Sequence, residues 1–270
     1  MTLSADRLAE FDAFLIALNR ASAGAILPLF RSDHGLENKL HGGFDPVTEA
    51  DKGAERAIRE MIAAHYPDHG VIGEEYGEDR PDAEFVWVLD PVDGTRAFIA
   101  GLPLWTTLIG LRHEGRPVLG SIGQPYIGEL YIGGAQTGSR LISRDGETPL
   151  QVRACPRLTD AIITTTDPAI LTGPELGAWT QVRAAARLAR LGLDAYGFAM
   201  VAAGTMDLAV DTGLKVWDVE AVIAVIEGAG GVCAHWDGSP ARSDGGKFAF
   251  AGDRDCLDEA LVALRRASRD

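Results

Sequence analysis

A short apolar run followed by a polar turn constrains the fold of this 270-residue chain more than any other feature. The run is Phe85-Val86-Trp87-Val88-Leu89, in which every residue is apolar rather than every second one. Such a run is typical of a buried strand, so its sheet is expected to lie between other layers. Asp90-Pro91-Val92-Asp93-Gly94-Thr95 follows directly, and Pro91 and Gly94 predict a tight loop that lets Asp90 and Asp93 converge.

Composition narrows the class of protein. The chain carries 25 Lys and Arg against 39 Asp and Glu, a formal net charge of −14, which argues against a nucleic-acid partner and suits cationic ligands or metal ions. Hydrophobic residues at 46% and charged residues at 24% exclude wholesale disorder. The length fits about two ordinary domains or one large layered α/β structure.

The cysteines and the N-terminus bear on location. An odd count of three cysteines without metal-like spacing indicates a reduced, intracellular protein. The apolar stretch Phe14–Phe30 is interrupted by Asn19, Arg20 and Pro28, which predicts an amphipathic helix rather than a signal peptide or a membrane span. We therefore expect a cytoplasmic protein that does not bind membranes.

Apolar spacing predicts the helices and strands. Helices are expected over Ala5–Phe30, from Thr48 to Pro67, and over Glu175–Leu188, Phe198–Ala203 and Val219–Ala229. Strands are expected over Val71–Gly73, Phe85–Leu89, Leu104–Arg112, Pro117–Gly123, Glu129–Ile132, Ala161–Thr166, Met206–Val210 and Val232–His235. Pro149–Val152 marks a seam between an N-terminal half, residues 1–150, and a C-terminal half, residues 151–270. This pattern predicts alternating layers of helix and sheet.

Several acidic residues stand at the ends of these elements. Arg96-Ala97-Phe98-Ile99 begins a helix, and the free N–H groups of Gly94 and Thr95 at its start form an anion site, above all for phosphate. Two aspartates repel an anion bound beside them unless cations lie between them. Mg²⁺ is the usual cation beside phosphates. Asp51, Glu74 and Asp218 offer further oxygen ligands. Taken singly, each has an ordinary structural explanation as a helix cap, a solvated loop residue or part of a turn, and only their combination indicates a metal site.

The combination resembles a known family. Asp90–Thr95, with Gly73-Glu74-Glu75 upstream and Trp217-Asp218-Val219-Glu220-Ala221 downstream, is similar to the inositol monophosphatase superfamily, and the resemblance runs from Asp45–Asp51 to Gly228–Gly231. It implies an αβαβα sandwich and a Mg²⁺-dependent, often lithium-sensitive phosphomonoesterase. Within the superfamily, the segments Asn38-Lys39, Asp45–Asp51, Arg96–Pro103 and Val201–Gly204 most resemble bacterial histidinol-phosphatases.

The resemblance also implies roles for individual residues. The expected ligands of two or three Mg²⁺ are Glu74, Asp90, Asp93, Asp218 and the Val92 carbonyl. Thr95 and Glu74 would position and deprotonate the attacking water, and Asp51 would hold the Thr95 hydroxyl. Gly94 and Thr95 would bind the phosphate. The positions expected to face the leaving group are Arg190, Gly192, Asp194 and Asp211. His65 and His113 belong to no catalytic motif and are expected on the surface.

The implied substrate is L-histidinol phosphate, a small phosphate monoester, hydrolysed by a homodimer. Two departures leave an alternative open: Trp217 stands where histidinol-phosphatases often carry Tyr, and Ala195 replaces a residue that is often Cys in that group. An inositol-1-monophosphatase, or a broad sugar or nucleotide monophosphatase, is the second reading. A non-catalytic Mg²⁺- and phosphate-binding regulator is the third, and the presence of every ligand position disfavours it.

Overall fold

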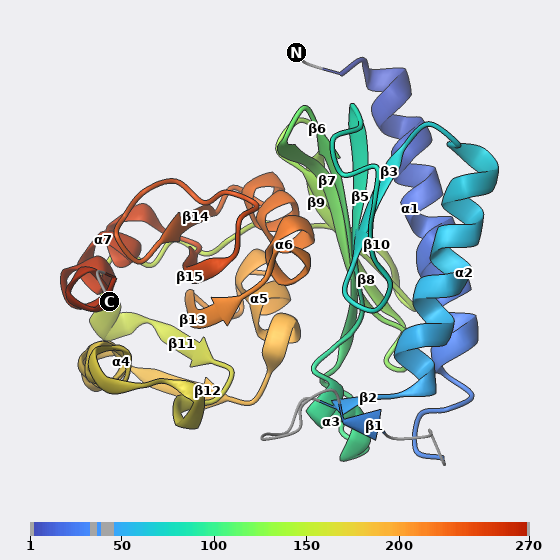
Figure 1. Ribbon diagram of the computed structural model, residues 1–270. Coiled ribbons are helices and arrows are strands. Elements are labelled where there is room, and N and C mark those ends of the chain that lie inside the picture. The colour runs from blue at the N-terminus through green and yellow to red at the C-terminus, as the bar shows by residue number, and fades with distance from the viewer. Residues whose placement is uncertain (1–2, 33–36, 39–45, 269–270) are drawn as a thin grey trace.

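The computed structural model describes residues 3–32, 37–38 and 46–268 as five alternating layers of helix and sheet (Figure 1). Helices α1 (Ala5–Ile26) and α2 (Glu49–His65) cover the outer face of a large sheet. Helices α5 (Asp194–Ala202) and α6 (Val216–Gly228) lie between this sheet and a smaller one. Helices α4 (Gly173–Ala185) and α7 (Arg254–Leu264) cover the far face of the small sheet. The αβαβα sandwich implied by the sequence is therefore confirmed. Lys39 and Asp45, which belong to the motifs quoted above, lie outside the described residues.

The outer helix layer follows the apolar spacing of the sequence. α1 (Ala5–Ile26) ends before Pro28 rather than at Phe30, and α2 (Glu49–His65) begins at the Thr48 cap. The Asp51 carboxylate accepts a hydrogen bond from the Thr48 backbone N–H (2.8 Å), which completes a capping box. Both helices bury their apolar faces against Trp87 and Leu89 of the sheet.

The large sheet has eight strands in the order β10-β9-β8-β7-β6-β5-β3-β4. Only β3 and β5 pair in parallel among these strands; the other pairs are antiparallel. The strands are β3 (Gly70–Gly73), β4 (Gly77–Asp79), β5 (Phe85–Asp93), β6 (Thr106–His113), β7 (Arg116–Gln124), β8 (Glu129–Gly134), β9 (Gly138–Ser143) and β10 (Gly146–Pro149). A two-stranded ribbon of β1 (Glu37–Asn38) and β2 (Pro46–Val47) stands apart from it.

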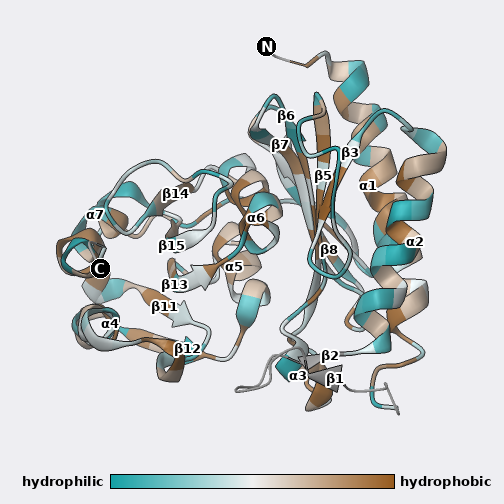
Figure 2. Ribbon diagram, viewed as in Figure 1, coloured by the Kyte–Doolittle hydropathy of each residue, from teal (hydrophilic) through white to brown (hydrophobic). Residues whose placement is uncertain are grey.

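The central strand β5 determines which side chains face the site. It is buried on both faces, as predicted, and it runs on to Asp93 with a register shift between Asp90 and Asp93 instead of ending at Leu89. Because side chains alternate along a strand, Val86, Val88 and Asp90 share the face opposite to Trp87 and Leu89. Val86 and Val88 pack against Val216 and Trp217 of α6, so Asp90 faces α6 as well. In Figure 2 brown, hydrophobic stretches are visible on both β5 and α6.

The small sheet has the order β12-β11-β13-β15-β14, in which β11 pairs in parallel with β12 and β13, whereas β15 pairs antiparallel with β13 and β14. Its strands are β11 (Ile162–Thr165), β12 (Leu188–Leu191), β13 (Leu208–Leu214), β14 (Val232–His235) and β15 (Gly246–Ala251). The remaining helices are α3 (Thr95–Ile99), α4 (Gly173–Ala185), α5 (Asp194–Ala202), α6 (Val216–Gly228) and α7 (Arg254–Leu264). Short 3₁₀ turns occupy Leu158–Asp160, Pro168–Ile170 and Arg265–Ala267.

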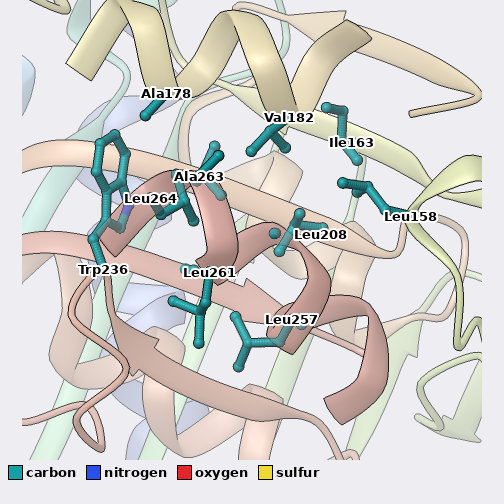
Figure 3. Packing of buried hydrophobic residues seen from close by; sticks show 14 of the residues in the cluster. Leu158, Ile163, Ala178, Val182, Leu208, Trp236, Leu257, Leu261, Ala263 and Leu264 are labelled. Atoms are coloured by element: carbon teal, nitrogen blue, oxygen red, sulfur yellow. The ribbon is translucent and has the colours of Figure 1, made fainter. Parts of the chain in front are cut away.

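Several sequence expectations about the second half are wrong. The helix expected over Glu175–Leu188 ends at Ala185, and Leu188 belongs to β12. α5 begins at Asp194 rather than Phe198, and β15 and α7 were not expected at all. α7 and α4 pack together over the small sheet and bury the cluster of Figure 3, which includes Val182, Leu208, Trp236 and Leu261.

The seam near residue 150 separates the two sheets, because β10 ends at Pro149 and β11 begins at Ile162. The division into two halves stays a prediction, since α5 and α6 contact both sheets. Among the described residues, no helix is both long and apolar enough to span a bilayer.

Candidate active site

Three carboxylates from two distant segments meet where β5 ends and α6 begins. Ligand oxygens of Asp90, Asp93 and Asp218 lie within 4.8 Å of one another. These residues line a cavity of about 260 Å³ together with Glu74, Val92, Gly94, Thr95, Lys215 and Trp217. The sequence motifs that were expected to converge therefore do so. An all-oxygen donor set of this kind suits a hard cation such as Mg²⁺.

Local backbone geometry aims each carboxylate. The Asp90 side chain accepts the Val92 backbone N–H (3.1 Å), which fixes the backbone at the register shift near the end of β5. Asp93 accepts the Ala195 N–H at the start of α5 (2.7 Å). Asp218 lies in the first turn of α6 and accepts the Lys215 N–H (2.6 Å), so it also satisfies the helix start.

Among the described residues, burial and mutual repulsion of the carboxylates outweigh the compensation that Lys215 and backbone hydrogen bonds give the cluster. Burial raises the pKa of Asp90 well above its usual value, and the nearby carboxylates of Glu74, Asp93 and Asp218 raise it further. Burial also raises the pKa of Asp93 well above its usual value, and the nearby Asp194 carboxylate raises it further. Burial raises the pKa of Asp218 to about 7. A divalent cation among these oxygens would favour their charged forms, so the donor set fits such an ion.

Glu74 is positioned by a residue that the sequence interpretation missed. Glu55 of α2 is fully buried, and its carboxylate accepts the backbone N–H groups of Glu75 (2.8 Å) and Tyr76 (3.2 Å). These bonds fix the loop that carries Glu74 into the cavity. Glu55 lies on the buried face of α2, beside its apolar residues. A charged residue at such an inward position is the only sequence signal for this role.

Thr95 and Asp51 hydrogen-bond to other residues and not, as expected, to each other. The Thr95 hydroxyl donates to the Val92 carbonyl (3.1 Å), whereas the Asp51 carboxylate accepts from Thr48. No hydrogen bond joins Asp51 to Thr95 within the described ranges. Asp51 is 2% exposed, and burial raises its pKa to about 6, so its observed role is to cap α2 near the cluster.

Gly94 is held in a conformation that favours glycine. Its φ is +79°, and a Cβ atom there would stand 3.1 Å from Oδ2 of Asp194. It caps α3, whose first N–H groups lack acceptors within the helix. Gly94 and Thr95 thus stand where a phosphate bound at the carboxylate cluster could reach backbone donors.

A second cavity adjoins the first across Gly94 and α3. It has a volume of about 360 Å³ and is lined by Arg96, Ala97, Leu102, Thr166, Asp167, Pro168, Leu191, Gly192 and Asp194. Of the four residues expected to face the leaving group, Gly192 and Asp194 line it. Asp194 has a φ of +48°, and burial raises the pKa of its carboxyl to about 6.

The other two expected substrate residues do not line this cavity in the described structure. Arg190 lies on the exposed edge strand β12. Asp211 is buried, and its carboxylate accepts the Thr165 hydroxyl (2.9 Å) and the Thr166 N–H (3.0 Å). Asp211 therefore shapes the cavity through Thr166, which does line it.

The two histidines differ in exposure. His65 is exposed at the end of α2, as expected. His113 was expected on the surface, but it is buried. Its ring stacks on Phe85 (centroids 4.6 Å apart) because β6 pairs with β5 at that position.

Comparison with known proteins agrees with this geometry. Residues 7–269 match the Inositol monophosphatase family. The bifunctional phosphatase IMPL2 of Arabidopsis thaliana is 37% identical over 97% of this chain and 77% of its own length. A histidinol-phosphatase of Chlorobaculum parvum is 40% identical over 74% of this chain and 76% of its own. The solved structure of an inositol monophosphatase from Zymomonas mobilis superposes with a TM-score of 0.86 at 35% identity, covering 97% and 99% of the two chains. The chain therefore belongs to the inositol monophosphatase family and is a phosphomonoesterase of that family.

Proposed function

We propose that the protein is a Mg²⁺-dependent phosphatase that hydrolyses L-histidinol phosphate to L-histidinol and phosphate. The observation that carries this substrate is the excess of carboxylates in the cavity beside the acidic cluster, where Asp167 and Asp194 stand against one guanidinium, that of Arg96. L-Histidinol carries a protonated amino group, which carboxylates attract. A neutral polyol such as inositol has no charge for them to attract. The 40% identical relative named histidinol-phosphatase supports the same substrate.

The residues that would hold Mg²⁺ are Glu74, Asp90, Asp93 and Asp218, with the Val92 carbonyl, and we propose two or three ions in turnover. When bound, Mg²⁺ lowers the pKa of water and neutralises charge on the phosphate and the leaving oxygen. The chain's own residues then have to orient the water and the ester.

Thr95 and Glu74 suit the task of handling water. Because the Thr95 hydroxyl donates its proton to the Val92 carbonyl, its oxygen remains free to accept a hydrogen bond from a water molecule. Glu74 lines the same cavity and would take the proton of that water. As the water oxygen bonds to phosphorus, the P–O ester bond breaks, and the N–H groups of Gly94 and Thr95 would stabilise the phosphate oxygens.

A second candidate is inositol-1-phosphate or a broader range of sugar and nucleotide phosphates. The residue before Asp218 is Trp217, which lines the acidic cavity and matches the inositol enzymes in the resemblance described above. The similar structure from Zymomonas mobilis is named an inositol monophosphatase. The neighbouring carboxylates make histidinol phosphate the better fit.

On the family resemblance we further propose a homodimer, lithium sensitivity and action in the cytoplasm, without a nucleic-acid or membrane partner. The free, buried state of Cys155, Cys233 and Cys256 supports a reducing compartment. Light scattering coupled to size exclusion tests the dimer, and phosphate release at increasing LiCl tests the inhibition.

The substrate is tested by phosphate release from histidinol phosphate, myo-inositol 1-phosphate, fructose 1,6-bisphosphate and AMP, with and without Mg²⁺. We expect histidinol phosphate to have the highest kcat/KM and turnover to require Mg²⁺. Asp93→Asn should abolish turnover of every substrate while the protein stays folded, since it removes a proposed cation ligand.

Two conservative variants separate substrate recognition from chemistry. Asp167→Asn and Asp194→Asn each remove a charge with little change of shape. Each should lower kcat/KM for histidinol phosphate about tenfold more than for inositol phosphate, equivalent to about 1.4 kcal/mol of lost attraction. A higher kcat/KM for inositol phosphate than for histidinol phosphate in the unaltered protein would refute the proposed substrate.

A further inference from the structure

A charged pair is buried where α6 crosses the large sheet. The Arg112 guanidinium of β6 donates to the Glu220 carboxylate of α6, with Nη2 2.7 Å and Nε 3.3 Å from Oε2. The side chain of Glu220 is 0% exposed and that of Arg112 is 14% exposed. Arg112 also donates to the Ser243 carbonyl (3.4 Å). The pair therefore joins the large sheet to elements of the second half of the chain.

Glycines allow α6 to lie directly on the sheet at this point. Gly110 of β6 and Gly120 of β7 are register partners. A Cβ at Gly110 would stand 2.5 Å from Cγ of Glu220, and one at Gly120 would stand 2.4 Å from the Ala221 carbonyl oxygen. Because these two glycines have no side chains, the α6 backbone can lie close to the sheet. For the same reason, they do little to fix how α6 is rotated or where it lies along its axis.

The Arg112–Glu220 pair adds a directional polar contact to the apolar packing of Val216 and Trp217 on β5, and it lies close in sequence to a candidate metal ligand. Asp218 is two residues before Glu220, in the first turn of α6. Arg112 stands two residues beyond Gly110 on the same strand, and its register partner is Val86 of β5, the strand that ends in Asp90 and Asp93. A rotation of α6 would therefore move Asp218 relative to both aspartates of β5.

Stability alone does not account for the pair. Removing two charges from water costs more than a well-packed apolar pair would, and Glu220 is only partly compensated. Its second oxygen, Oε1, is buried without a hydrogen-bond partner among the described residues. The guanidinium instead places two N–H donors on one carboxylate oxygen, Oε2, which is a directional contact that an apolar pair cannot make.

We propose that Arg112 and Glu220 are positioning residues that fix α6 on the large sheet and thereby hold Asp218 in register with Asp90 and Asp93 for cation binding. Glu220 and Arg112 would touch neither the substrate nor the ion. The proposal depends on the metal-dependent phosphatase class and not on histidinol phosphate as the substrate.

The test measures the Mg²⁺ dissociation constant by titration calorimetry, with Mg²⁺ alone and without substrate. Arg112→Met leaves a buried charge unpaired, and the double variant Arg112→Met with Glu220→Leu replaces the pair by apolar side chains. We expect both to bind Mg²⁺ about tenfold more weakly, as when residues that orient metal ligands are lost. The double variant should recover melting temperature relative to the single one, and kcat at saturating Mg²⁺ should stay within about threefold of the original.

The matched control is Arg153→Met. Arg153 also pairs with a fully buried carboxylate, that of Asp207 (Nε to Oδ1 2.9 Å), but this pair ties Arg153 to the small sheet away from the cluster. It should lower the melting temperature and leave Mg²⁺ binding unchanged. The proposal is overturned if the double variant binds Mg²⁺ like the original protein, or if Arg153→Met weakens Mg²⁺ binding as much as Arg112→Met does.

Discussion

Gly94 shows how one residue combines a backbone requirement with a contact in the site. Its φ of +79° disfavours side chains, and Asp194 occupies the space that a Cβ would need. Gly94→Val should therefore displace Asp194 and lower kcat/KM about 100-fold, a typical effect of misplacing a site by about 1 Å.

A second glycine isolates the backbone contribution. Gly115, in the turn between β6 and β7, has a φ of +78° and open space around its Cβ position. Gly115→Val should cost about 1–2 kcal/mol of folding free energy and leave kcat/KM unchanged. Equal kinetic losses in the two variants would show that the contact with Asp194 is irrelevant.

Asp211 gives a prediction for pH dependence. Burial raises the pKa of its carboxyl from 3.8 to about 7, despite hydrogen bonds from Thr165 and Thr166 that act in the opposite direction. The folded state therefore retains a proton that the unfolded state loses. Through this group, the free energy of unfolding falls as pH rises from about 4 to about 7 and is constant above that range.

Asp211→Asn should remove that part of the pH dependence. Relative to the original protein, the variant should gain stability between pH 4 and pH 7, as measured by denaturant unfolding at both pH values. A pH-independent difference between the two proteins would contradict the raised pKa.

At the level of single residues, the sequence predicted which acids converge but not their detailed contacts. Asp90, Asp93 and Asp218 were identifiable because each ends or begins an element near a buried strand. The expectation that Asp51 contacts Thr95 was wrong. Thr48 lies nearer in the chain, and its backbone N–H donates to the Asp51 carboxylate at the start of the helix. The role of Glu55 depends on a loop twenty residues away, so its inward position on the helix marks it as unusual but does not identify its partners.

At the level of elements, helices with a clear apolar stripe were predictable and elements formed by tertiary pairing were not. α2 has such a stripe and a cap signal. β12 follows an alanine-rich helix and contains Ala189, so local preference favours continuing the helix, and only parallel pairing with β11 makes this segment a strand. β15 places Phe248 and Phe250 on one face and Ala249 and Ala251 on the other, between two separate cores.

Two helices carry glycines that neither packing nor backbone geometry requires. A Cβ at Gly24 in α1 or at Gly177 in α4 would meet no atom within 4 Å, and neither has positive φ. Gly24→Ala and Gly177→Ala should each raise the free energy of unfolding by about 0.5–1 kcal/mol, because alanine costs less backbone entropy in a helix.

Denaturant unfolding measures these gains, and phosphatase activity should not change. Gly120→Ala serves as the contrasting variant. Its Cβ would overlap the Ala221 carbonyl, so the melting temperature should fall. A loss of stability in Gly24→Ala would show that α1 packs against something at this position.

For the whole molecule, the layer order followed from the family resemblance, whereas local pattern gave only alternation of helix and sheet. The layered arrangement places β5 of the large sheet against α6, which lies between the two sheets. Asp90 and Asp93 come from the first and Asp218 from the second, so a cation at this point would join the layers. Its removal should therefore affect the stability of the fold as well as the chemistry.

Chelation tests this directly. At an Mg²⁺ concentration about 100 times its dissociation constant, binding to the folded state adds about 2.7 kcal/mol, which for a chain of this size corresponds to a melting temperature higher by about 5 °C or more. Addition of EDTA should reverse the increase. Asp93→Asn should lack it, whereas Asp211→Asn, whose carboxylate lies outside the acidic cavity, should retain it. If Mg²⁺ raised the melting temperature of Asp93→Asn as much as that of the original protein, the ion would be binding elsewhere, and the acids of β5 and α6 would not be its site.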